Sequence, residues 1–193
     1  GNKLLEEITY KINKNKKAKA MWKNTDILVV DEVSMLSLKL FDLLNAVGKK
    51  IRQNFRPFGG IQVIFSGDFY QLPPVGSRED PDTMRFCFES NDWNTIFARE
   101  CQIQLKTIYR QTDNTYTKIL NQIREGKIKR STIEVINQYI NREKSEDTLV
   151  VKLYPIRSKV EQINKTEMEK LETQPNLFKL KFETELEMSN SDK

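Results

Sequence analysis

The sequence predicts an α/β protein in which helices flank a parallel β-sheet. Two short apolar runs rich in β-branched residues, 26–30 and 61–65, are typical of strands buried on both faces of such a sheet. Residues 34–53 between them carry apolar side chains at helical spacing, so strands and helices alternate along the chain. A length of 193 residues leaves room for one ordinary domain or two small ones.

The composition excludes several classes of protein. No apolar run approaches the roughly 20 residues that span a bilayer, so we expect no membrane protein. Because the sequence has no histidine, carboxylates must do any acid–base chemistry. Cys87 and Cys101 are too few for a four-cysteine zinc site, although one disulfide remains possible, and this usage predicts an intracellular, reducing compartment. The net charge of +5 equals the excess of lysine over glutamate in residues 1–23.

The first half of the chain should contain two helices and two strands. Residues 1–23 predict an exposed helix followed by a solvated, lysine-rich turn. The helix at 34–53 follows the first strand, with Ser34 as a possible N-cap. Its packed face is expected to carry Leu36, Leu40, Leu43, Leu44 and Val47. The second strand leads into residues 66–75, where two prolines and a glycine predict a loop.

The second half alternates in the same way. A short helix is expected at 92–98 and a third strand at 101–105. Residues 113–125 and 131–141 predict two helices separated at Gly126, a plausible C-cap. A fourth strand is expected at 148–154 and a last helix at 158–171.

Polar residues at the carboxyl ends of parallel strands are candidates for ligand binding. Asp31 and Glu32 follow the first strand, where an aspartate can hold Mg²⁺ and a glutamate can polarise an attacking water. Taken alone, this pair is more typical of an acidic N-cap region before the helix at Ser34. The loop after the second strand carries Gln71, whose side-chain amide can read a terminal phosphate. The alternative for this loop is a rigid surface turn.

Five segments occur in the order found in the Pif-type DNA helicases of superfamily 1, and the chain resembles that family from about Trp22 to Leu171. The segments are DEVSML, LKLFDLLNAVGKKIR, GDFYQLPPV, LKTIYRQTD and LYPIRSKVEQIN. The resemblance implies a RecA-like sheet, with residues 1–144 forming part of the first RecA-like domain and residues 145–193 beginning the second. It also implies an ATP-dependent DNA helicase that couples ATP hydrolysis to translocation on single strands and unwinding of forked DNA. Roles in DNA repair, recombination and telomere maintenance would follow.

The resemblance assigns roles to individual residues. Asp31 is similar to the Mg²⁺-binding aspartate, and Glu32 to the base that activates water for attack on the γ-phosphate of ATP. Gln71 resembles the phosphate-sensing glutamine, with Gly67 and Asp68 shaping its loop. Arg110 matches the arginine that contacts the γ-phosphate, a role for which an always-charged planar fork is suited.

The sequence lacks a phosphate cradle. None of its seven glycines begins a G-x-x-x-x-G-K-[ST] motif, and Gly48 and Gly126 precede lysines without the hydroxyl residue. We therefore expect the chain to start just past the P-loop and to end early in the second domain, with little or no ATPase activity of its own. Ile156 replaces the threonine more usual in the family, which puts a DNA contact there in doubt.

Single-stranded DNA is the expected macromolecular partner. Residues 106–130 combine an excess of basic side chains with two tyrosines, which suits neutralisation of phosphates and stacking of bases. The weaker candidates for these contacts are Lys106, Tyr109, Arg124, Lys127 and Arg157. A solvated helix face is the alternative. The oligomeric state stays open, with a monomer expected, as does the choice among nucleus, mitochondrion and a viral or cytoplasmic replication site. A non-catalytic DNA- or partner-binding remnant is the alternative function.

Overall fold

The structure is a computed structural model that describes residues 2–140, 151–174 and 176–178. It divides into two units, residues 1–140 and 141–193. In the described ranges, no helix has the length and apolar character needed to cross a membrane. The assignment of the two units to successive RecA-like domains stays a prediction.

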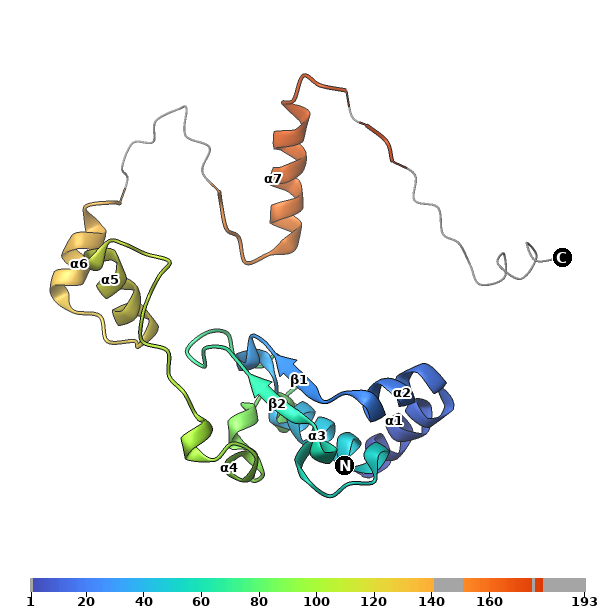
Figure 1. Ribbon diagram of the computed structural model, residues 1–193. Coiled ribbons are helices and arrows are strands. Elements are labelled where there is room, and N and C mark those ends of the chain that lie inside the picture. Colours follow the sequence, from blue (N-terminus) through green and yellow to red (C-terminus); the bar gives the residue numbers. More distant parts are fainter. Residues whose placement is uncertain (1, 141–150, 175, 179–193) are drawn as a thin grey trace. The chain divides into compact units, whose positions relative to one another are not determined.

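The first unit contains the predicted parallel strand pair. Strands β1 (Ile27–Val30) and β2 (Gln62–Phe65) run parallel, with Ile27 opposite Gln62 and Val30 opposite Phe65 (Figure 1). Leu28, Val30, Val63 and Phe65 pack against the core, whereas Ile27 and Val29 are 53% and 62% exposed. The expectation of burial on both faces is therefore wrong for the described residues. A two-stranded sheet that packs on one face alternates between buried and exposed side chains.

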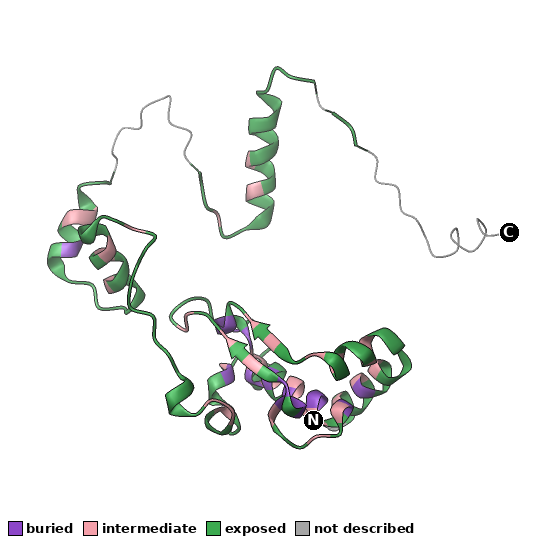
Figure 2. Ribbon diagram, viewed as in Figure 1, coloured by how far each residue is buried: buried purple, intermediate pink, exposed green. Residues whose placement is uncertain are grey.

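Helix α3 (Leu38–Arg52) covers the buried face of this pair and supplies the centre of the core. Figure 2 shows buried segments on α3. Phe41 is fully buried, and the centre of its ring lies 5.6 Å from that of Phe58, 5.9 Å from that of Phe65 and 5.6 Å from that of Trp93. The predicted face is wrong in part, because Leu40 is exposed and Phe41, next to it, faces inward. Rotation of the helix by one residue, about 100°, accounts for the difference.

The N-cap of α3 also differs from the prediction. Ser37 caps the helix, since its side-chain oxygen accepts a hydrogen bond from the Leu40 amide at 3.2 Å. Ser34 instead lies buried in the short 3₁₀ helix η1 (Val33–Met35). An extra turn thus separates Glu32 from α3.

Gly48 allows close packing between α3 and the 3₁₀ helix η2 (Pro57–Gly60). A Cβ on Gly48 would lie 2.6 Å from the Phe58 carbonyl oxygen. Buried Asn45 accepts a hydrogen bond from the Phe58 amide at 2.9 Å and so fixes the same turn. Gly48, the first residue of the Gly-Lys-Lys sequence at 48–50, therefore serves close packing inside a helix.

Two helices precede the sheet where one helix and a solvated turn were expected. Helix α1 (Asn2–Lys14) ends before Asn15, which caps α2 (Lys16–Asn24) by accepting a hydrogen bond from the Ala18 amide at 3.0 Å. The lysine-rich segment is thus helical. Lysine has good helix propensity, and the cap supplies the missing start signal.

Short elements follow β2. They are the 3₁₀ helices η3 (Pro81–Thr83), η4 (Cys87–Glu89) and η5 (Arg99–Cys101) and helix α4 (Trp93–Ile96), which lies within the helix expected at 92–98. The third strand predicted at 101–105 is wrong. These residues are irregular after Cys101, and Ile103 and Leu105 are 83% and 90% exposed. A segment with alternating apolar residues becomes a strand only when its backbone can pair with a neighbouring strand, and residues 101–105 pair with none of the described strands.

The last described helices match the expected positions. Helix α5 (Asn114–Arg124) is capped by Asp113, and Gly126 follows it in the left-handed region at φ +67°. Helix α6 (Arg130–Asn137) comes next. In the second unit, α7 spans Arg157–Glu169. Of the fourth strand predicted at 148–154, residues 148–150 lie outside the described residues, and residues 151–154 do not form a strand.

Candidate functional site

The carboxyl ends of β1 and β2 bring Asp31 and Ser66 together. The Ser66 hydroxyl donates a hydrogen bond to Asp31 Oδ1 at 2.5 Å. Main-chain bonds fix this geometry, since the Ser66 amide donates to the Val30 carbonyl at 2.9 Å and the Val33 amide donates to the Ser66 carbonyl at 3.0 Å. The hydroxyl, followed by the Glu32 amide, holds the pKa of the Asp31 carboxyl below its usual value. An ionised, exposed carboxylate therefore stands at the end of the sheet.

Glu32 has an unusual backbone conformation. Its φ of 52° and ψ of 44° place it in the left-handed region, which costs a non-glycine residue free energy. The strained residue turns the chain between β1 and η1 and leaves the Glu32 side chain exposed beside Asp31. Such strain is concentrated at functional sites.

Gly67 lets the loop after β2 approach this turn. Its φ is +152°, and a Cβ at this position would lie 2.7 Å from the Val33 amide nitrogen and 3.3 Å from the Glu32 carbonyl carbon. Only a residue without a side chain allows this contact. The sequence prediction that Gly67 shapes the loop has a steric basis here.

The next residues form a turn that is anchored in the core. The Asp68 carboxylate accepts a hydrogen bond from the Tyr70 amide at 3.1 Å, and the Asp68 carbonyl accepts one from the Gln71 amide at 2.9 Å. Phe69 inserts between aromatic rings, with centroid distances of 4.8 Å to Phe88 and 6.2 Å to Trp93. Gln71 is exposed immediately after this anchor.

Arg124 of α5 binds the same turn. Its Nε and Nη2 donate to the two carboxylate oxygens of Asp68 at 2.7 and 2.8 Å, and its guanidinium lies 4.6 Å from the centre of the Tyr70 ring. Arg124, more than any other group, lowers the pKa of Asp68, and the Gln71 side chain contributes in the same direction. Sequence reasoning placed Arg124 on DNA, whereas its side chain here contacts the loop.

The other predicted site residues lie elsewhere. Arg110 is exposed in the irregular segment 102–113, and within the part of the chain that is described it has no hydrogen-bond or ion-pair partner. Lys106, Tyr109 and Lys127 are also exposed. Arg157 belongs to the second unit, where it pairs with Glu161 at 2.8 Å. The structure thus gathers Asp31, Glu32, Gly67, Asp68 and Gln71 on neighbouring turns and does not bring Arg110 to them by any contact.

The donor set suits a magnesium ion bound mainly by other ligands. Among the described residues, no group of three or more acidic or cysteine side chains could enclose a metal. Mg²⁺ commonly keeps several waters and takes one or two carboxylates together with substrate phosphates. Asp31, with its hydroxyl partner Ser66, fits that requirement.

Two residues that matter in this geometry were not singled out from the sequence. The Ser66 hydroxyl donates a hydrogen bond to Asp31, and the Tyr70 ring makes a cation–π contact with the guanidinium of Arg124. The signal for Ser66 was its place directly after the second strand, because the ends of parallel neighbours share one edge of the sheet. No local sequence pattern predicts the role of Tyr70, because its partner Arg124 lies 54 positions away in the sequence.

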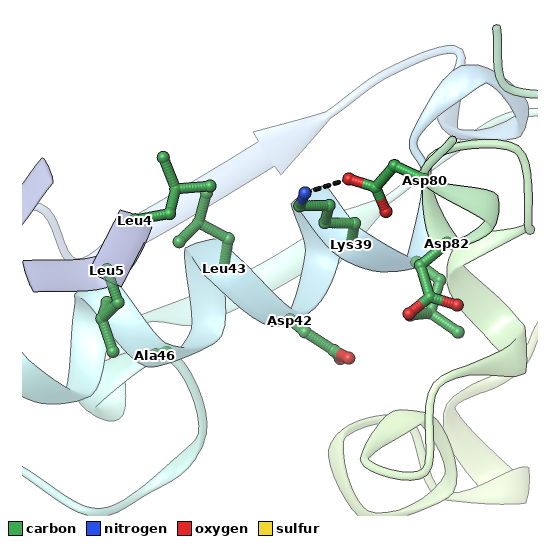
Figure 3. A pocket seen from close by; sticks show the side chains of 9 residues that line it. Leu4, Leu5, Lys39, Asp42, Leu43, Ala46, Asp80 and Asp82 are labelled. Atoms are coloured by element: carbon green, nitrogen blue, oxygen red, sulfur yellow. Dashed lines mark hydrogen bonds and ion pairs between the residues drawn. The ribbon is translucent and has the colours of Figure 1, made fainter. Parts of the chain in front are cut away.

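A separate pocket of about 450 Å³ lies between α1, α3 and the turn at residue 80. Figure 3 shows Leu4, Leu5 and Leu43 on one side and the ion pair of Lys39 with Asp80 on the other. None of the predicted site residues lines it. We therefore assign it no part in the candidate site.

Comparison with known proteins decides the family. Residues 2–134 match the family model described as PIF1-like helicase. The chain belongs to this family. It is 36% identical to the ATP-dependent DNA helicase RRM3 of Saccharomyces cerevisiae over 174 residues, which cover 89% of this chain and 24% of the relative. It is 37% identical to the ATP-dependent DNA helicase PIF1 of Emericella nidulans over 179 residues, which cover 92% of this chain and 24% of the relative.

Solved structures agree with this membership of the PIF1-like family. The crystal structure of Pif1 helicase from Candida albicans is 35% identical, with a TM-score of 0.72 over 88% of this chain and 38% of that chain. The Bacteroides Pif1 in complex with ADP-AlF3 and single-stranded DNA is 24% identical, with a TM-score of 0.66 over 83% of this chain and 39% of that chain, and it shows the fold alone. The predicted α/β, RecA-like class is confirmed. The chain spans about a quarter of the length of these two curated relatives.

Proposed function

We propose that this chain forms part of an ATP-dependent DNA helicase motor, which couples ATP hydrolysis to translocation on single-stranded DNA and unwinding of duplexes and forks. The observation that carries the proposal is the Asp31–Ser66 hydrogen bond, because it sets an ionised carboxylate at the shared end of two parallel strands. Membership of a family whose curated relatives are ATP-dependent DNA helicases supports it. Work in DNA repair, recombination and telomere maintenance is part of the proposal through the family alone.

Each residue at the sheet edge has a task in this proposal. Asp31 would hold Mg²⁺, which supplies neutralisation of phosphate charge. Glu32, exposed and turned out by its left-handed backbone, would accept a proton from the attacking water. Gln71 would contact the terminal phosphate from the anchored loop, and Arg110 would reach that phosphate from segment 102–113. The chain itself thus supplies a metal ligand, a base and two phosphate contacts.

A chimera tests the role of Glu32. The 174-residue stretch of the yeast RRM3 helicase that aligns with this chain is replaced by the corresponding residues of this chain, and ATP hydrolysis stimulated by single-stranded DNA is measured. We expect turnover in the chimera and a loss of about 10²–10⁴-fold on Glu32→Gln, the range typical of a general base.

Glu79→Gln is the matched control, since Glu79 is exposed in a loop, and it should leave turnover unchanged. A folded chimera, judged by circular dichroism and oligonucleotide binding, that hydrolyses ATP equally well with Glu32→Gln would contradict the assignment. A folded chimera without any turnover would favour the non-catalytic remnant.

The DNA partner is tested on the 193-residue chain. Binding of a fluorescent single-stranded oligonucleotide is measured from about 50 to about 200 mM salt. Phosphate contacts predict an affinity that falls steeply with salt, because each neutralised phosphate releases counterions. Absence of binding at the lowest salt would remove DNA from the proposal for this part of the motor.

A further inference from the structure

The loop that carries Gln71 is held from three sides. Gly67 places its start against the Val33 amide, and Phe69 inserts its ring among Phe86, Phe88 and Trp93. Arg124 provides the third contact, and it comes from a helix 56 positions further along the chain than Asp68.

The contact made by Arg124 has the geometry of a specific interaction. Two nitrogens of one guanidinium meet the two oxygens of one carboxylate at 2.7 and 2.8 Å, an arrangement that restricts distance and orientation together. The guanidinium also stacks against Tyr70 at 4.6 Å, so it contacts the residues on both sides of Phe69. The side chains of Arg124 and Asp68 are only 37% and 22% exposed, which separates this pair from the open i,i+4 pairs of α6 and α7.

Asp68 passes this constraint on to Gln71. Its carboxylate accepts from the Tyr70 amide and its carbonyl accepts from the Gln71 amide, so the carboxylate and the backbone of Gln71 belong to one turn. A change in the contact between Arg124 and Asp68 should therefore alter the backbone of Gln71, and with it the place of the Gln71 side chain.

We infer that Arg124 is a positioning residue, which sets the place of Gln71 by gripping Asp68 and Tyr70 and so ties the loop 66–75 to helix α5. The inference rests on the proposed function for the meaning of Gln71, but the contact itself does not. A shift of α5 moves the loop, and a ligand that moves the loop pulls on α5. Arg124 then acts through protein contacts and neutralises no DNA phosphate.

The test compares Arg124→Gln and Arg124→Lys in the 193-residue chain. The readouts are the side-chain amide resonances of Gln71 by NMR and hydrogen exchange of the Gln71 backbone amide. Arg124→Gln should shift the resonances and speed exchange by about tenfold or more, because the ion pair and the stacking are lost. Arg124→Lys keeps the charge and one hydrogen bond and should restore part of the protection.

Arg130→Gln is the matched control on α6, since Arg130 makes only an open pair with Glu134 at 3.4 Å, and it should change neither readout. Unchanged Gln71 signals in a folded Arg124→Gln chain would overturn the inference. Rescue by lysine is the outcome that a general loss of folding cannot give.

A DNA titration separates this inference from the phosphate-contact alternative. In the salt series with single-stranded oligonucleotide, Arg124→Gln should leave the slope of log affinity against log salt unchanged. A slope reduced by about one would assign the guanidinium to a DNA phosphate and overturn the positioning role. Because the NMR readout needs neither ATP nor DNA, it can succeed or fail whether or not the chain acts in a helicase.

Discussion

Gly67 shows how strongly one residue constrains the candidate site. The turn at Glu32 and the start of the loop at Gly67 approach so closely that a Cβ would overlap the Val33 amide at 2.7 Å. The overlap involves backbone, which cannot rotate away as a side chain can. The two turns that carry the acidic pair and Gln71 are therefore matched in shape to each other.

Replacing Gly67 with alanine should destabilise the protein and separate these turns. We expect a loss of roughly 2–3 kcal/mol in the free energy of unfolding, because backbone strain and a steric clash add. Gly126→Ala is the control, since Gly126 also has positive φ but nothing lies within 4 Å of the point that an added Cβ would occupy, and it should cost only roughly 1 kcal/mol. Urea unfolding measures both, and equal losses would refute the steric argument.

The two cysteines should differ sharply in reactivity. Cys87 is fully buried in the core, and burial raises the pKa of its thiol to about 11. Because the thiolate is the reactive form, a raised pKa leaves Cys87 protonated and inert at neutral pH, while Cys101 is exposed. At about pH 8, iodoacetamide should modify Cys101 alone in the native chain and both cysteines in urea. Mass spectrometry of the peptides checks this, and native labelling of Cys87 would contradict the burial.

At the scale of elements, Arg52 joins α2, the end of α3 and the turn before β2. Its Nε donates to the Gly59 carbonyl at 2.8 Å, and its Nη1 lies 2.8–2.9 Å from the carbonyls of Trp22, Lys23 and Thr25. These carbonyls belong to the end of α2 and the residues after it. One guanidinium thus satisfies main-chain oxygens from two segments that lead into β1 and β2.

Arg52→Lys should destabilise the chain although the charge is kept. A lysine ammonium cannot reach carbonyls on both segments at once, so we expect a loss of about 1.5–3 kcal/mol, the range for hydrogen bonds to charged groups. Arg56→Lys, at an exposed position in the turn that follows α3, is the matched control and should stay within about 0.5 kcal/mol. Thermal unfolding followed by circular dichroism gives both values. Equal stability of the two variants would mean that the carbonyl contacts contribute nothing net.

Element prediction from sequence succeeded where a local pattern carries the whole signal. The apolar runs 26–30 and 61–65 contain their strands, and Gly126, predicted to separate two helices, lies just past the end of α5 in the left-handed region. It failed where the outcome depends on distant partners. The pattern at 101–105 found no strand to pair with, and the choice of Ser37 over Ser34 as N-cap depended on the extra turn of η1.

The candidate site divides in the same way. Asp31 and Glu32 directly follow β1, and Gly67 and Gln71 lie in the loop after β2. Position after a strand predicts these residues as candidates, the family resemblance assigns their roles, and those roles stay predictions. Ser66, 35 residues from its partner Asp31, has a signal only through its place after the second strand, whereas no pattern pairs Arg124 with Asp68 across 56 residues. Such contacts depend on how segments pack, which no local pattern encodes.

At the scale of the whole molecule, the hydrophobic core of the described residues lies in the first unit, 1–140. Val33, Leu36, Phe41, Phe58, Ile61 and Cys87 form the buried cluster, and the residues packed against it run from Trp22 to Phe97. None of these core residues belongs to the second unit, 141–193. We therefore predict that the first unit folds without the second.

A chain cut after Ile140 should fold as the 193-residue chain does. The apolar area removed from water in the core is the main source of stability, and the cut leaves all of its members in place. We expect the midpoint of thermal unfolding to change by less than about 3 °C. A larger shift would require a loss of about 1 kcal/mol or more in the free energy of unfolding. Near-ultraviolet circular dichroism of Trp22 and Trp93, both packed on the core, reports the tertiary structure. Loss of that signal in the shortened chain would show that residues 141–193 take part in folding the first unit.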